Sequence, residues 1–164
     1  MTHLREHVHI HASADEVYGR LAALEEHRRW LPSAFRGVVA TRDSLSFDLR
    51  LPLRRDRARL AVTGDEAPAL LVLERDGVEG GAGSIHSLTW ALHVEAPREV
   101  HLTLEVAYHP AGGALGALLE VALHRRLRQQ AFREALWRLK LLIERGGEGR
   151  NGRDGSGGRG TGAA

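Results

Sequence analysis

Three histidines alternate with apolar residues in the segment HVHIH, and imidazole nitrogens are common metal ligands. Same-face residues of a strand lie about 6.6 Å apart for each two steps, so about 13 Å separates His7 from His11. Since metal–nitrogen bonds are about 2.1 Å long, the three rings cannot share one ion. A neighbouring pair could bind a metal only with a further ligand from an adjacent strand. We expect no metal and no cofactor, and we expect solvated histidines, because Val8 and Ile10 occupy the opposite, inner face.

A second candidate site lies in the C-terminal part of the chain, where steps of three and four residues trace one helical seam. The seam comprises Leu118, Ala122, Arg125, Gln129, Phe132, Leu136, Leu139 and Ile143. It is apolar at both ends and polar at Arg125 and Gln129. A buried, unpaired guanidinium is very costly, so Arg125 must meet water, a carboxylate or a ligand. Two interpretations stay open: both side chains reach solvent, or both are polar anchors in an apolar pocket, the usual form of a small-molecule site.

Two predicted strands carry further polar groups on their apolar faces. His86 and Trp90 share one parity of their strand, and Tyr108 lies on the apolar parity of the next. If these faces point inward, His86 and Tyr108 lie at different ends of one cavity; otherwise Trp90 is core filler and His86 a rim residue. Glu6 is inward by parity on the first strand. It either pairs with an inward arginine or lies exposed at the strand end.

Hydrophobic periodicity predicts the elements that must position these groups. We predict a strand over residues 3–11, a helix capped by Ser13 and Glu16, and a short helical turn ended by Pro32. Because the later connections are too short for crossovers, period two predicts six antiparallel strands. They span residues 35–41, 45–51, 57–63, 69–75, 88–94 and 100–108. A turn is expected at residues 54–56, a loop at 77–83, and one long helix over 114–145.

Composition indicates one soluble domain. The chain has 164 residues, of which 43% are hydrophobic, and no cysteine, which excludes disulfides and thiolate sites. The net charge of +2 gives no nucleic-acid signature, because the pI of 9.6 only reflects how little titrates above neutral pH. Since no segment reads as a signal peptide or membrane span, we expect a cytoplasmic protein without nucleic-acid partners. Peripheral membrane contact through residues 124–130 stays open, and the sequence leaves the oligomeric state undecided.

The order of these elements resembles the helix-grip fold of the START-like (SRPBCC) superfamily, which includes polyketide cyclases and coenzyme Q-binding proteins. The segments HVHIHASADEVYGRLAALEEHRRWLP and LGALLEVALHRRLRQQAFREALWRLKLLIE are similar to its opening and closing elements. The resemblance covers roughly residues 3–145. It implies an α+β helix-grip domain over residues 1–145, with about seven antiparallel strands curved around the C-terminal helix and an apolar cavity between them. Residues 146–164 are expected to form a disordered Gly/Arg-rich tail.

The resemblance implies three alternative functions. The first, which we favour, is non-enzymatic binding or transport of a hydrophobic small molecule such as a lipid, quinone or polyketide. The second is a cyclase or dehydratase in which Arg125 polarises a carbonyl and His86 or Tyr108 moves a proton. The third is a protein-interaction module. No catalytic residue can be carried over from the cyclases, and the expected ligand-binding residues are Arg125, Gln129, His86, Trp90, Tyr108, Leu118 and Ala122.

Overall fold

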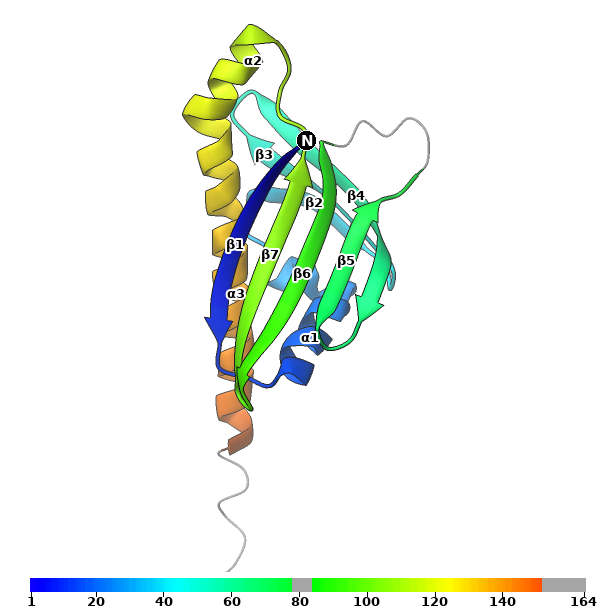
Figure 1. Ribbon diagram of the computed structural model, residues 1–164, viewed down its shortest axis with the longest axis vertical. Coiled ribbons are helices and arrows are strands. Elements are labelled where there is room, and N and C mark those ends of the chain that lie inside the picture. Colours follow the sequence, from blue (N-terminus) through cyan, green and yellow to red (C-terminus); the bar gives the residue numbers. More distant parts are fainter. Residues whose placement is uncertain (78–83, 152–164) are drawn as a thin grey trace, which may run out of the picture.

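A seven-stranded antiparallel sheet curls toward a long C-terminal helix, as Figure 1 shows. The computed structural model describes residues 1–77 and 84–151. In chain order the elements are β1 (Thr2–Ile10), α1 (Ala14–Ala22), η1 (Leu24–Arg29), β2 (Phe35–Ala40), β3 (Ser44–Leu51), β4 (Arg54–Glu66), β5 (Leu70–Arg75), β6 (Ile85–Ala96), β7 (Glu99–Tyr108), α2 (Gly113–Leu119), η2 (Glu120–His124) and α3 (Arg125–Asn151). The strand order β1-β7-β6-β5-β4-β3-β2 confirms the predicted helix-grip architecture.

The predicted start of α1 is also confirmed. Ser13 precedes the helix with extended backbone, and its hydroxyl oxygen accepts a hydrogen bond from the Glu16 backbone N–H at 3.2 Å. This bond satisfies one of the amide groups that lack an intrahelical partner in the first turn. Val17 and Leu21 then point from α1 into the core. The cap therefore fixes where the chain leaves β1 and where α1 meets the sheet.

The core lies between the concave face of the sheet and the helices. Alternate residues of the strands are buried on this face because side chains of a strand alternate between its two sides. Phe132 of α3 packs edge-on against Phe35, which packs in the same way against Phe47, with ring centroids 5.3 and 5.1 Å apart. The C-terminal half of the predicted seam is buried as expected, at Leu136, Leu139 and Ile143. The helix thus closes the concave side of the sheet, and it also packs along the edge strand β1.

Several predicted boundaries were wrong, and two of them concern the elements that carry the candidate site. Residues 54–56, expected as a turn, belong to β4, and Asp56 is paired in register with Leu49. The reversal needs only Pro52 and Leu53, because Leu53 adopts a left-handed backbone conformation with φ of 59°. The C-terminal helix continues to Asn151, past its predicted end at about residue 145. Most of the predicted loop (78–83) and residues 152–164 of the predicted tail lie outside the described residues.

Among the described residues, no helix combines the length and the apolarity that crossing a membrane requires.

The aromatic contacts of α3 generate a stability prediction. Phe132 is 2% exposed, whereas Trp137 on the same helix is 54% exposed. Phe132→Ala should lower the free energy of unfolding by about 3–5 kcal/mol through lost burial and a residual cavity. Trp137→Ala should change it by less than about 1 kcal/mol. Urea unfolding followed by circular dichroism measures both, and equal losses for the two variants would contradict this packing.

Candidate functional site

The C-terminal helix changes its geometry where it passes over one end of the sheet. α2 leads into α3 through η2, a π-helical turn over Glu120–His124. Hydrogen bonds in a π-helix run from residue i to i+5, so the turn is wider than an α-helical turn and rotates less for each residue. Glu120, His124 and Arg128 follow one another at steps of four residues, and all three are buried against the sheet. The helix therefore presents a column of polar side chains inward.

The N-terminal half of the predicted helical seam, from Leu118 to Gln129, is not the buried face of the helix. Leu118 is 65% exposed, Ala122 and Arg125 are also exposed, and Gln129 is half-buried. The inner face runs back from Phe132 in steps of four residues, whereas the prediction took a step of three. Of the two interpretations left open, exposure to solvent is therefore correct for Arg125.

Arg128 is the centre of a buried ionic cluster. Its Nε donates to Asp56 Oδ2 at 2.6 Å, and its Nη1 and Nη2 donate to the two carboxylate oxygens of Glu120 at 2.6 and 3.3 Å. Its guanidinium lies over the ring of Tyr108, 3.8 Å from the centroid. Tyr108 in turn donates its hydroxyl proton to Glu120 Oε1 at 3.2 Å. We call Asp56, Tyr108, Glu120, His124 and Arg128 the Arg128 cluster.

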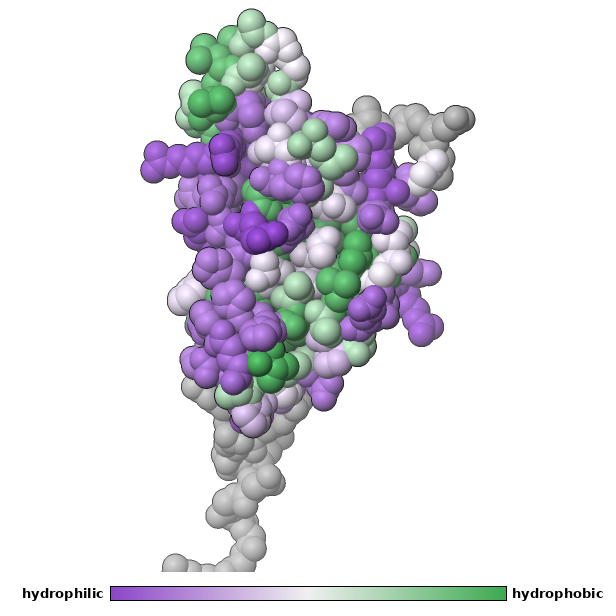
Figure 2. Space-filling model, viewed as in Figure 1, coloured by the Kyte–Doolittle hydropathy of each residue, from purple (hydrophilic) through white to green (hydrophobic). Residues whose placement is uncertain are grey.

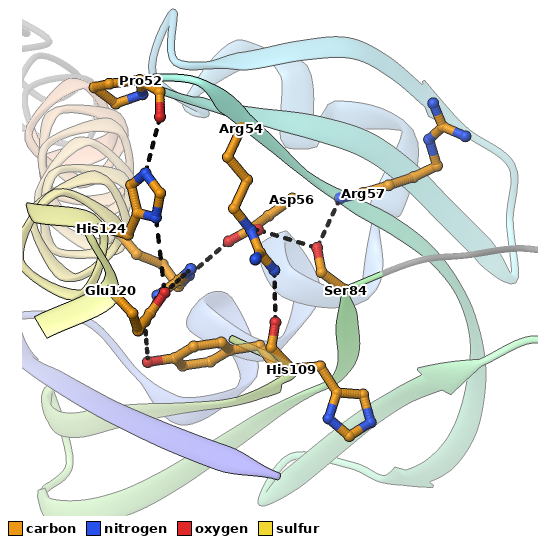
Figure 3. Close-up of polar contacts among 10 residues, drawn as sticks. Pro52, Arg54, Asp56, Arg57, Ser84, His109, Glu120 and His124 are labelled. Carbon is orange, nitrogen blue, oxygen red and sulfur yellow. Dashed lines mark hydrogen bonds and ion pairs between the residues drawn. The ribbon is translucent and has the colours of Figure 1, made fainter. Parts of the chain in front are cut away.

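A second set of polar groups surrounds the Arg128 cluster (Figure 3). Arg54 Nε and Ser84 Oγ both donate to Asp56 Oδ1, at 2.6 and 3.1 Å. Arg54 Nη2 also donates to the backbone oxygen of His109 at 2.6 Å, whereas the His109 ring points away from the site. Asp56 is therefore fully engaged by three donors from three elements, Arg54 beside it on β4, Ser84 just before β6, and Arg128 on α3.

His124 retains one unused ring nitrogen. Its Nε2 lies 2.8 Å from the Pro52 carbonyl oxygen, and since a carbonyl only accepts, Nε2 carries the proton. Its Nδ1 lies 3.9 Å from Glu120 Oε2, is buried, and has no hydrogen-bond partner among the described residues. A neutral imidazole with this tautomer offers a lone pair that can accept a hydrogen bond from a hydroxyl group or a water molecule.

The electrostatics of the cluster keep its ion pairs intact and its phenol protonated. Burial by itself lowers the pKa of the Arg128 guanidinium, but the hydrogen bonds to Glu120 and Asp56 outweigh burial and raise that pKa above its ordinary value. Burial raises the pKa of the Tyr108 hydroxyl, although the charge of Arg128 opposes the increase. The hydroxyl is therefore a hydrogen-bond donor at neutral pH, and the guanidinium is a permanent cation.

A smaller group of rings occupies the other end of the concave face. Trp90 of β6 contacts Trp30, and His27 of η1 packs on Trp30, with centroid distances of 5.9 and 4.6 Å. His27 Nε2 donates to the Leu21 carbonyl at 2.7 Å, and burial lowers the pKa of its ring to about 4. Both indole N–H groups and His27 Nδ1 are buried without a partner within the described part of the chain.

Of the strand residues predicted for the site, two lie on the predicted face of the sheet and one does not. Tyr108 and Trp90 are buried on the concave face, as their parity predicts. His86 sits at a β-bulge between the pairs of Ile85 and Ser87, so Ile85 takes the core position beside Tyr108. The His86 ring instead packs against that of His109 at 4.3 Å. The bulge thus breaks the alternation on which the prediction for His86 relied.

Glu6 follows its predicted inward parity. It is 6% exposed, and its carboxylate accepts two hydrogen bonds from Arg133 of α3, at 3.0 and 3.2 Å. Of the two alternatives, Glu6 does pair with an arginine, but the side chain of Arg133 is 67% exposed and is not inward as predicted. The pair ties the edge strand β1 to the C-terminal helix.

Sequence reasoning missed the Arg128 cluster although the sequence carries two signals for it. Asp56 shares the parity of Ala58 and Leu60, so a longer reading of β4 would have placed a carboxylate on the inner face. On the helix, Glu120, His124 and Arg128 recur every four residues, which places acid and base on one face. A buried carboxylate requires a cation, and Arg128 is the one that this face supplies.

The turn before the cluster is apolar and exposed. Leu115, Leu118 and Val121 are 71%, 65% and 82% exposed, and α2 has no buried residue. Figure 2 shows hydrophobic surface over α2 at the top of the molecule. An exposed apolar helix therefore runs directly into the buried polar cluster.

The buried histidine generates a prediction for acid stability. An ordinary histidine pKa is about 6.5, and burial lowers the pKa of His27 to about 4. At pH values between these two, the unfolded chain therefore binds more protons than the folded protein does. Stability must therefore fall as pH decreases through this window, with His27 contributing about 3 kcal/mol of the loss. Urea unfolding of wild type and His27→Gln at pH 7 and pH 4 measures this. Identical acid losses for the two proteins would contradict a neutral buried His27.

Two arginines one turn apart on α3 give a matched pair of variants. Arg128→Met leaves Asp56 and Glu120 buried with fewer donors and should lower the free energy of unfolding by about 3–5 kcal/mol. Arg125→Met removes an exposed charge and should change it by less than about 0.5 kcal/mol. Chemical denaturation measures both, and a larger loss for Arg125→Met would refute the inner face assigned here.

Comparisons with known proteins agree with this architecture. The structure of TTHA0849 from Thermus thermophilus is similar with a TM-score of 0.71 and 18% identity, covering 88% of this chain and 99% of that one. A START superfamily protein from Mycobacterium smegmatis gives 0.62 and 12%, covering 87% and 97%. The di-domain ARO/CYC BexL from the BE-7585A biosynthetic pathway gives 0.60 and 20%, covering 88% of this chain and 47% of that one. These likenesses show the fold.

No curated protein sequence matches this chain. The sequence model of one family, described as polyketide cyclase / dehydrase and lipid transport, matches residues 1–144. This match includes all seven strands, α1, η1, α2, η2 and α3 as far as Glu144. The chain therefore belongs to the polyketide cyclase / dehydrase and lipid transport family.

Proposed function

We propose that this protein binds and carries a hydrophobic small molecule along α2, with the Arg128 cluster at the polar end of the ligand. The observation that carries the proposal is the position of this cluster, a buried ionic network beside a largely apolar core. Apolar residues of similar volume often stabilise a fold as well as a buried ion pair does. A network placed there is consistent with recognition of a polar group, and the family description includes lipid transport.

The chemistry of the cluster suits a ligand with a neutral polar head. Two buried carboxylates already compensate Arg128 and Arg54, so a charged head would unbalance the site. The free lone pair on His124 Nδ1 can accept a hydrogen bond from a hydroxyl group. The side chain of Arg54 is 16% exposed and can donate to a carbonyl oxygen at the solvent edge of the cluster. Quinones, sterol-like alcohols and polyketides carry such heads on apolar bodies.

The exposed apolar turn of α2 supports the same function. Leu119 directly precedes Glu120, so the leucines of α2 adjoin the polar cluster along the helix. Covering these side chains with an apolar ligand contributes about 25 cal/mol for each Å² removed from water. A ligand with its head at the cluster and its body along α2 would use both features. Within this proposal, Tyr108 contacts the head, whereas Arg125, exposed on α3, contributes nothing to affinity.

Native mass spectrometry of freshly purified protein tests this proposal. A bound apolar molecule of a few hundred daltons is expected to co-purify with the wild type. The double variant Leu115→Ser/Leu118→Ser changes two exposed residues and should fold normally, yet it should lose most of the bound molecule. Val94→Ser, which changes an exposed residue of β6, is the matched control and should retain it. Absence of any co-purified molecule, or equal retention in all three proteins, would contradict the proposal and favour a protein-interaction module.

A cyclase or dehydratase using the same cluster is the second candidate. It is favoured by the protonated Tyr108 hydroxyl, which lies beneath Arg128 and is positioned by Glu120. Such a pair could polarise a carbonyl and deliver a proton. Dehydration would convert the bound molecule into one lighter by a single water. The two functions are therefore distinguished by whether the co-purified molecule changes mass over time, and whether Tyr108→Phe prevents the change.

A further inference from the structure

The outer face of the sheet brings together histidines from three adjacent strands. His101 of β7 is paired in register with His9 of β1 on one side and with His93 of β6 on the other. Glu95 lies at a β-bulge of β6 between Val94 and Ala96, and its carboxylate reaches the histidines, with Oε2 3.3 Å from His9 Nδ1. This row is separated from the Arg128 cluster by the sheet itself, since the apolar neighbours of these residues face inward. It supplies the cross-strand ligands that the segment HVHIH by itself lacks.

The ligand atoms of this row lie at distances suited to one metal ion. His9 Nε2 is 3.2 Å from His101 Nδ1, and the other ring nitrogen, His9 Nδ1, is 3.3 Å from Glu95 Oε2. Only one of the two His9 nitrogens can bind a given ion. One atom each from His9, Glu95 and His101 can be chosen so that all three lie within 4.8 Å of one another. Tetrahedral zinc with bonds of about 2.0–2.1 Å separates neighbouring ligand atoms by about 3.4 Å. Small rotations of exposed side chains suffice to close the difference, because His9 and Glu95 are 50% and 36% exposed.

The surroundings of the His101 ring also suit metal binding. Metal ions bind the neutral form of imidazole. Burial lowers the pKa of His101, and the neighbouring His9, His7 and His93 lower it further, while Glu95 opposes the decrease. His7 stacks on His101 with ring centroids 5.2 Å apart and limits the orientation of that ring. The His101 ring is thus partly preorganised.

We propose that His9, Glu95 and His101 form a binding site for a divalent transition-metal ion, with Zn²⁺ as the physiological class. Two imidazoles and one carboxylate form a ligand set that zinc accepts, and a water molecule would complete a tetrahedron. This ligand set disfavours Mg²⁺ and Ca²⁺, because these hard cations prefer oxygen ligands to imidazole nitrogens. An ion in this position would join β1, β7 and β6, and so would hold the edge strand β1 onto the sheet. The site is independent of the proposed small-molecule function.

Zinc titration by calorimetry tests the proposal on the full-length chain, prepared without a histidine tag and stripped with a chelator. We expect saturable binding at pH 7.5 that weakens below pH 6.5, where protons compete for the imidazoles. His9→Ala and His101→Ala should each reduce zinc affinity at least about tenfold, the lower limit of what even outer-shell partners contribute. Zinc should also raise the melting temperature of the wild type but not of these two variants.

His3→Ala provides the matched control. His3 lies on the same strand, and its Nδ1 lies 3.1 Å from Glu105 Oε1. Among the described residues, no third histidine or carboxylate completes a metal-ligand set with this pair. Removal of the His3 ring should leave zinc affinity unchanged. Cobalt(II) absorption adds a structural readout, because a tetrahedral site gives intense visible bands that a hydrated octahedral ion does not. Equal zinc affinity in wild type and His101→Ala, or an octahedral cobalt spectrum, would overturn the site and leave an ordinary row of surface histidines.

Discussion

A guanidinium buried beneath a helix must meet its counter-charges, and this requirement determines how the C-terminal helix lies on the sheet. Arg128 has no exposed surface, and an uncompensated charge in that position would cost several kcal/mol. Asp56 supplies one carboxylate from β4, and Glu120 supplies the other from two turns earlier on the helix. The three side chains can meet only if the helix crosses β4 at one rotation about its axis. The apolar core alone would tolerate others.

The π-helical turn is the local consequence of this constraint. An α-helix turns through 100° per residue, so residues at successive steps of four drift around its surface. The wider turn over Glu120–His124 offsets part of that drift and keeps Glu120 and His124 directed at the sheet. The same turn leaves its own Val121 exposed, as are Leu115 and Leu118 of the preceding α2. A buried cluster and an exposed apolar surface thus arise together from a single change in helix geometry, and the proposed ligand site uses both.

The fold was accessible from the sequence, because alternation within strands and the Ser13 cap are local signals with large energetic weight. The candidate site was less accessible. Tyr108 and Trp90 were placed correctly by parity, since β7 and the middle of β6 are regular. His86 was misplaced by a bulge, and Arg125 was chosen over Arg128 because a helix with ideal periodicity places both near the same seam. Distinguishing them requires Asp56, a long-range partner that local periodicity does not reveal.

The histidine row is a second case in which a local sequence pattern does not reveal long-range partners. Along β1, the spacing of His7, His9 and His11 excludes a shared metal ion, and that argument stays valid for the strand in isolation. The pairing of β1 with β7 and of β7 with β6 brings His101 and Glu95 beside His9. Register between strands is a tertiary property, so a ligand set assembled across three strands cannot be read from any one segment.

The most direct test of the central claim replaces the ionic network by apolar residues of similar size. The quadruple variant Arg54→Met/Asp56→Leu/Glu120→Leu/Arg128→Met removes both carboxylates and both guanidinium groups that they compensate, so no uncompensated charge of the network stays behind. If the network serves ligand recognition, this variant should unfold at the wild-type urea concentration or higher, and native mass spectrometry should find it without the co-purified molecule. A variant that is strongly destabilised, or one that retains the molecule, would contradict the account.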